Sequence, residues 1–238
     1  PDFAIPGGTF DESFIAEVVV NKVAMHLPLY RQEERLRGLG IGISRQTLCR
    51  QYIAAAEVLR PLYLRLKALM IARGVIFTDD TPVPVQDKKR TKTRTGRIWV
   101  YAGDREHPYT VYDYTPDRSR DGPVRFLEGY EGYLQADAYP GYDGLYQSGR
   151  ITEVACWAHV RRKYVEAELA HPVHAAIAVA WIRRLYWIEK VSKEMKATSR
   201  KALRQEKASP LLVAVRAWLD QAVLEVLPPS RAFTGFDP

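Results

Sequence analysis

The sequence predicts an α/β fold: a mixed five-stranded sheet with flanking helices, preceded by an all-helical segment and followed by a further helical segment. Apolar residues recur at intervals of about 3.6 within residues 13–72 and again within 173–227, which is the spacing of helices. Between these segments, short runs of β-branched and aromatic residues alternate with polar residues, as in strands. Hairpin-linked strands come first and strand–helix repeats follow. That order gives a sheet with both antiparallel and parallel neighbours.

The N-terminal segment is predicted to be helical. Residues 1–12 are rich in Pro and Gly and are expected to form a linker, and residues 13–72 to form three or four helices. Pro28 opens the second helix, and Ser44 is a suitable N-cap for the last one. Pro61 is expected to break or kink that last helix, because proline lacks the backbone N–H and clashes with the preceding turn.

Two of these helices, within residues 27–53, are similar to a helix-turn-helix. Arg45 and Arg50 fall on the second helix, which in such units enters the DNA major groove. Helical pairs are also common as packing units. The alternative is therefore that this pair only braces the domain that follows.

The central segment supplies the predicted sheet. Its strands are residues 74–79, 97–104, 108–116, 133–139 and a segment beginning at Ile151, with short helices at 121–132 and 141–149 and a helix beginning near His159. The second and third strands are expected to form a hairpin that closes between Asp104 and His107.

Composition narrows the class of partner. The formal net charge is +7 and the pI is about 9.4, which favours a polyanion such as nucleic acid or an anionic membrane. The longest apolar run, residues 175–182, is too short to span a bilayer, and the N-terminus lacks the pattern of a signal peptide. With only two cysteines, a disulfide framework is excluded and a reducing compartment is expected. Nucleic acid is therefore the favoured partner.

Two aspartates suggest a metal site. Asp79 ends the first predicted strand and Asp137 lies near the end of the fourth, and in a mixed sheet of this order those strands are neighbours. Both carboxylates are then expected at the carboxyl ends of adjacent strands. Two carboxylates held close repel one another, and Mg²⁺ or Mn²⁺ would relieve that repulsion through hard oxygen ligands. The alternative is that both are turn-forming or capping residues.

Basic residues follow the first acid directly. The loop after the first strand and the start of the second strand carry six of them: Lys88, Lys89, Arg90, Lys92, Arg94 and Arg97. Such a loop beside a metal site would bind a phosphate backbone without reading bases, although it could equally be a solvated hairpin loop. From Lys190 to Lys207, seven basic residues and two acidic ones form a second charged stretch, which is either solvated or a nucleic-acid contact.

A further basic group begins the helix after the fifth strand. Cys156 and His159 are three residues apart, but two ligands do not make a structural zinc site. His159, Arg161, Arg162 and Lys163 instead lie at the start of a helix, where backbone N–H groups and positive side chains suit phosphate.

Eight motifs in this order resemble the transposases of the insertion sequence 66 family, which belongs to the DDE superfamily with an RNase H-like core. They are "HLPLYRQEERL", "GIGISRQTL", "DDTPVPV", "TGRIWVYAGD", "YTPDRS", "LQADAYPGYDGLY", "ACWAHVRRKY" and "RRLYWIEK". The resemblance implies an RNase H-like catalytic core over residues 73–170, incomplete here, after a helical, helix-turn-helix-like domain over 13–72. It also implies that residues 171–238 are a truncated helical insertion.

The resemblance also implies roles for individual residues. Asp79 and Asp137 match the first two catalytic, metal-binding acids, and Asp80 and Thr81 match supporting positions, where the family usually has Glu for Asp80. The third catalytic acid of the family is a Glu in an Asn-rich segment beyond the insertion, and the chain ends before any such segment. The acids of the insertion do not match it: Glu189, Glu194, Glu206 and Glu225. We therefore expect the chain to be inactive by itself.

The resemblance implies a function and its partners: a bacterial transposase core that cleaves DNA and transfers strands of an insertion sequence with Mg²⁺ or Mn²⁺. Double-stranded DNA, as element ends and target, is the expected partner, and a homo-oligomer in synapsis, at the nucleoid in the cytoplasm, is expected by analogy. Two alternatives remain open. One is a catalytically dead transposase remnant that binds DNA or partner subunits, and the other is a non-transposing RNase H-like nuclease.

Overall fold

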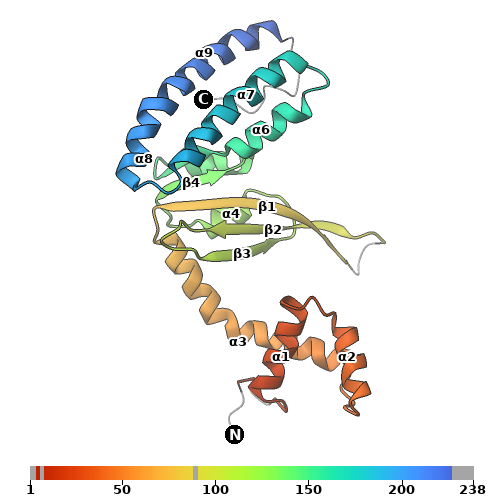
Figure 1. Ribbon diagram of the computed structural model, residues 1–238. Coiled ribbons are helices and arrows are strands. Elements are labelled where there is room, and N and C mark those ends of the chain that lie inside the picture. Colours follow the sequence, from red (N-terminus) through yellow and green to blue (C-terminus); the bar gives the residue numbers. More distant parts are fainter. Residues whose placement is uncertain (1–3, 6–7, 88–90, 227–238) are drawn as a thin grey trace.

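A five-stranded mixed sheet forms the centre of the chain in the computed structural model, which describes residues 4–5, 8–87 and 91–226 (Figure 1). The strand order is β3-β2-β1-β4-β5. The strands are β1 (Val75–Val85), β2 (Arg94–Ala102), β3 (Thr110–Thr115), β4 (Gly132–Ala136) and β5 (Ile151–Ala155). β1, β2 and β3 are antiparallel neighbours, whereas β4 runs parallel to both β1 and β5. The predicted mixed sheet with flanking helices is confirmed, and it is consistent with an RNase H-like core.

The first strand is longer than predicted. β1 does not end at Asp79 but continues to Val85, pairing with β2 from Phe77–Ala102 to Val85–Arg94. Pro82 and Pro84 lie within this longer strand, and both are tolerated because pairing with β4 stops at Phe77 and leaves that edge of β1 without a strand partner among the described residues. The paired ends of β1 and β2, residues 82–85 and 94–96, therefore project beyond the rest of the sheet (Figure 1).

One face of the sheet carries the main core. Ile76, Trp99, Tyr101 and Leu134 are fully buried on it, because alternate strand residues point to the same side. The helix α4 (Asp121–Phe126) covers this face, and the ring of Phe126 stacks on Tyr101 with centroids 3.6 Å apart. Two short elements after β4, η1 (Pro140–Tyr142) and α5 (Asp143–Tyr146), pack beside it.

Three helices precede the sheet, as predicted: α1 (Glu12–Val23), α2 (Leu29–Gly38) and α3 (Arg45–Ile71). The predicted cap is confirmed, since the hydroxyl of Ser44 accepts a hydrogen bond from the Thr47 N–H at 3.2 Å. Of the break or kink expected at Pro61, the break is wrong, because α3 runs unbroken for 27 residues, and the kink stays a prediction. Both halves of the helix are anchored elsewhere: Leu48 is buried among the helices and Met70 in the sheet core, and this packing outweighs one lost hydrogen bond.

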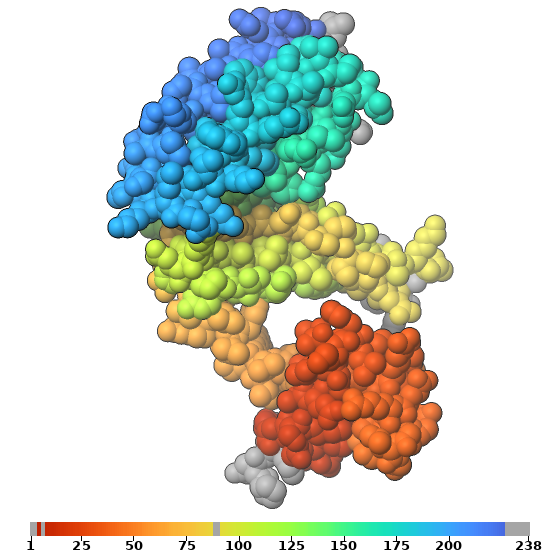
Figure 2. Space-filling view, in the orientation of Figure 1, coloured from red at the N-terminus to blue at the C-terminus, as the bar shows by residue number. Residues whose placement is uncertain are grey.

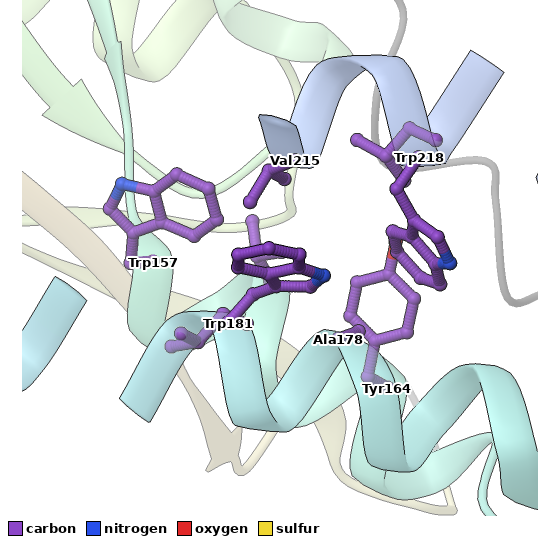
Figure 3. Close-up of a pocket in the computed structure, with 9 residues that line it drawn as sticks. Trp157, Tyr164, Ala178, Trp181, Val215 and Trp218 are labelled. Carbon is purple, nitrogen blue, oxygen red and sulfur yellow. The ribbon is translucent and has the colours of Figure 1, made fainter. Parts of the chain in front are cut away.

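A helical unit follows β5. It consists of α6 (Trp157–Glu166), α7 (Pro172–Ser192), α8 (Ala197–Leu203), a π-helical turn η2 (Arg204–Ala208) and α9 (Ser209–Glu225). Its core gathers aromatic rings from α6, α7 and α9, among them Trp157, Tyr164, Trp181 and Trp218 (Figure 3). The cavity between them has a volume of about 10 Å³, at the lower limit for one water molecule. These rings therefore form a packed core and leave no room for a ligand.

The length and apolar character of the described helices decide whether one of them could cross a membrane. Within residues 4–5, 8–87 and 91–226, no helix combines the length and the apolar character needed to cross a membrane.

Candidate metal centre and its basic surroundings

Three carboxylates meet where β1 and β4 part. Asp79 and Asp80 lie in β1, and Asp137 directly follows β4. Phe77 is the register partner of Gln135 in the parallel pair, so Asp79 and Asp137 both lie two residues further along neighbouring strands. One carboxylate oxygen from each of the three acids lies within 4.8 Å of the others. Asp79 and Asp137 were predicted to lie together, because both were expected at the ends of adjacent strands.

Asp79 is the accessible member of this group. Its side chain is 52% exposed, and its Oδ1 accepts a hydrogen bond from the Asp80 N–H at 2.8 Å. His159 Nε2, from the first turn of α6, lies 3.5 Å from Asp79 Oδ2. His159 therefore lies beside the acids, and among the described residues its buried Nδ1 has no hydrogen-bond partner. The orientation of the imidazole thus adds a nitrogen to the carboxylate site.

Asp80 is held differently from Asp79. Its side chain is only 2% exposed, and both oxygens accept hydrogen bonds from guanidinium groups. Arg97 Nη1 donates to Oδ2 at 2.9 Å, and Arg118 donates to Oδ1 from Nε at 2.9 Å and from Nη2 at 2.7 Å. A buried carboxylate needs such partners, so the two guanidinium groups account for its burial. Arg97, predicted to contact nucleic acid, is thus engaged inside the site.

Arg118 is the residue that sequence reasoning missed. Its Nη2 also donates to Asp137 Oδ2 at 3.1 Å, so one guanidinium joins two of the three acids. The group stacks on the Tyr139 ring, 4.1 Å from its centroid, and the Tyr139 hydroxyl donates to the Arg118 carbonyl oxygen. Partial burial by itself would lower the pKa of Arg118, but hydrogen bonds and charges from Asp80 and Asp137 outweigh it and raise that pKa. Arg118 therefore stays charged.

The net charge of the site is suited to a bound cation. Three carboxylates and two guanidinium groups give a net charge of −1. Both oxygens of Asp80 are taken by arginines, whereas Asp79 is exposed and the described residues bind only one oxygen of Asp137. The oxygens of Asp79 and Asp137 that remain are the hard ligands that Mg²⁺ and Mn²⁺ prefer. The donor set therefore fits a divalent ion of this kind.

The other basic residues have varied surroundings. Lys88, Lys89 and Arg90 lie outside the described residues. Arg94 donates to the Tyr114 hydroxyl at 3.3 Å, and Lys92 is exposed. Arg161, Arg162 and Lys163 are exposed on α6, and Arg45 and Arg50 are exposed on the first turns of α3. The exposed residues among these are accessible to a partner, and all the predicted contacts with nucleic acid stay predictions.

The sheet topology is consistent with an RNase H-like core. Residues 7–236 match the family model described as "Transposase IS66 family", and the chain belongs to this family. The family named from the motifs is therefore confirmed.

Curated relatives come from Sinorhizobium fredii. "Uncharacterized protein y4hP" is 33% identical over 243 residues, which covers 92% of this chain and 44% of the relative. "Uncharacterized protein y4jD" is 32% identical over 226 residues, with 90% and 44% covered. The chain thus spans less than half the length of these relatives.

Proposed function

We propose that this chain is the central part of a DNA transposase in which Asp79 and Asp137 hold Mg²⁺ or Mn²⁺ for strand cleavage and strand transfer. Membership of the transposase family supports the general role. The observation that carries the finer proposal is the meeting of Asp79 and Asp137 at neighbouring parallel strands, with oxygens within 4.8 Å. A divalent ion at such a site supplies an activated water or hydroxyl and stabilises the leaving oxygen in phosphoryl transfer.

The residues of the proposed site have different roles. Asp79 and Asp137 present oxygens to the ion. Asp80, bonded on both sides by Arg97 and Arg118, holds Arg118 in place, and Arg118 in turn fixes one oxygen of Asp137. Asp80 is therefore proposed to be a positioning residue, in keeping with the supporting position that the family resemblance implies for it. Thr81, exposed and two residues beyond Asp79, lies on the same side of β1 and is proposed to support that face of the site.

DNA is proposed to reach the site over its basic surroundings. The exposed cations of α6, with Lys92 and Arg94 near the projecting hairpin, are placed to bind phosphates without reading bases. Arg45 and Arg50 on α3 are proposed to contact DNA from the helix-turn-helix-like domain. Synapsis of two element ends would bring two copies of the protein together.

One observation favours a second candidate, a DNA-binding remnant without catalysis. Because Arg97 and Arg118 occupy Asp80, the described residues leave Asp79 and Asp137 as the carboxylate ligands of the site. Losing one member of a catalytic set commonly removes most activity. For the second candidate we expect DNA binding without cleavage, whereas the first candidate requires the whole protein to cleave and join DNA.

The test is Mg²⁺-dependent cleavage and joining of element-end DNA by the whole protein, comparing wild type with Asp137→Ala. Asp143→Ala, an exposed acid outside the carboxylate group, is the matched control. We expect wild type and Asp143→Ala to cleave and join, and Asp137→Ala to do neither. If Asp137→Ala were as active as wild type, the assignment of Asp137 to the metal site would be refuted. Cleavage without joining by wild type would favour a nuclease.

A further inference from the structure

A second basic surface lies away from the carboxylates. The end of α7, the turn into α8 and the β2–β3 turn together line an open cleft of about 450 Å³. Its lining residues are Arg105, Tyr186, Glu189, Lys190, Lys193 and Arg200. In Figure 2 the blue and cyan helical unit rests against the yellow-green sheet region on this side. The cleft shares no residue with the metal centre. Three of its cations, Lys190, Lys193 and Arg200, come from the charged stretch that the sequence left open as solvated or as a nucleic-acid contact.

Among the described residues that line this cleft, Glu189 is the one acid, and it is already paired with a cation. Arg204 donates to Glu189 Oε1 from Nε at 2.7 Å and to Oε2 from Nη2 at 2.5 Å. The hydrogen bond from Arg204 lowers the pKa of Glu189, so the carboxylate stays ionised and paired. Among the lining residues four cations face one anion, so the lining carries a net charge of +3, and Arg204 pairs with that anion from outside the cleft.

Arg200 holds the cleft in shape. Its guanidinium donates to the carbonyl oxygens of Ser192, Lys193 and Met195 at 3.1 to 3.2 Å, where α7 ends. The Ser192 carbonyl, at the last residue of α7, also accepts a hydrogen bond from the Met195 N–H at 3.0 Å, and Lys193 and Met195 lie in the turn that follows. Arg200 thereby fixes the turn that carries Lys193.

The opposite wall is also ordered. Asp104 Oδ1 accepts hydrogen bonds from the backbone N–H groups of Glu106 and His107 at 3.0 and 2.9 Å. These bonds fix the β2–β3 turn on which Arg105 lies. Among the described residues, Arg105, Lys190 and Lys193 have no acid within ion-pair distance. Three exposed cations are therefore held around the cleft without an internal partner.

We infer that this cleft binds the phosphodiester backbone of DNA, as a second contact separate from the metal centre. The cleft is open and strongly positive, which suits a long polyanion rather than an apolar ligand. Tyr186, which is 41% exposed, offers an aromatic surface between the cations for a sugar or a base. The inference rests on the proposed function only for the identity of the polyanion.

The experiment measures binding of the whole chain to a 30-base-pair duplex of arbitrary sequence by fluorescence anisotropy at several salt concentrations. Wild type is compared with a triple variant, Arg105→Gln, Lys190→Gln and Lys193→Gln. The matched control removes the same charge from exposed cations of the same helices that do not line the cleft: Arg183→Gln, Lys196→Gln and Lys201→Gln. Circular dichroism confirms that each variant is folded.

We expect the cleft variant to lower the slope of log K against log salt by about 2 to 3, since each lost phosphate contact lowers it by about 0.9. The control should lower it by less than about 1. Equal effects from both variants, or no effect from the cleft variant, would overturn the inference. Competition by polyglutamate as strong as that by DNA would also overturn it in favour of an acidic protein partner.

The outcome is separable from the proposed function. If the wild-type chain binds no DNA, the inference that the cleft binds DNA is refuted. The proposed function is decided separately, by the Asp137→Ala comparison in the whole protein. A cleft variant that loses DNA affinity should still bind Mn²⁺ as wild type does, because it leaves every carboxylate of the metal centre in place.

Discussion

Replacing Arg118 by Ala tests how the carboxylates are held together. Arg118 donates two hydrogen bonds to Asp80 and one to Asp137, and Asp80 is 2% exposed. Removing one partner of a buried ion pair costs about 3–5 kcal/mol, because the other charge is left uncompensated. Arg97 still binds Asp80 and the Arg118 side chain is 35% exposed, so we expect a smaller loss, about 2 kcal/mol in the free energy of unfolding.

The assay is urea unfolding followed by circular dichroism in the presence of EDTA. Arg120→Ala is the matched control, because Arg120 lies two residues further along, is exposed and has no acid partner among the described residues. We expect that control to change the free energy of unfolding by less than about 0.5 kcal/mol. If Arg118→Ala were as stable as Arg120→Ala, the ion pairs would not be what holds Asp80 and Asp137 in position.

Three further predictions concern the rest of the chain. Pro61→Ala should stabilise α3 by about 2–3 kcal/mol, because proline inside a helix removes a hydrogen bond, and a higher urea midpoint would show it. Ile182→Ala should destabilise the helical unit by about 3 kcal/mol, measured by its thermal unfolding, since Ile182 is 2% exposed in that core. Burial raises the pKa of Tyr130 to about 12, because the folded protein accommodates the neutral phenol better than the charged phenolate. The contribution of Tyr130 to the free energy of unfolding should be fully present below the ordinary tyrosine pKa of about 10 and should be lost as pH rises towards 12. The free energy of unfolding of Tyr130→Phe should therefore fall less steeply over this range.

Much of the fold could be predicted because its signals are local. Periodicity separated helices from strands, and the order of hairpin and crossover units predicted a mixed sheet. The position of Asp79 beside Asp137 followed from the same reasoning, because parallel neighbours bring their corresponding ends together. The cap at Ser44 depended on three residues of sequence and was likewise predictable.

The errors have a common physical origin, since each depends on contacts between distant parts of the chain. The first strand was predicted to end at Asp79, but β1 continues to Val85 because it pairs with β2 over that length, and this pairing is a property of the whole sheet. Pro61 breaks a helix only if packing on both sides is weak. Arg118 is 38 residues from Asp80, and nothing in their spacing indicated three hydrogen bonds between Arg118 and two acids.

The central claim is that Asp79 and Asp137 form a metal site, and calorimetric titration of the chain with Mn²⁺ tests it most directly. We expect wild type and Asp143→Asn to bind Mn²⁺ alike. Asp79→Asn and Asp137→Asn should each bind more than about tenfold more weakly, because changes even outside the ligand shell typically cost about 10- to 100-fold. No Mn²⁺ binding by wild type, or unchanged binding by Asp79→Asn and Asp137→Asn, would contradict the claim.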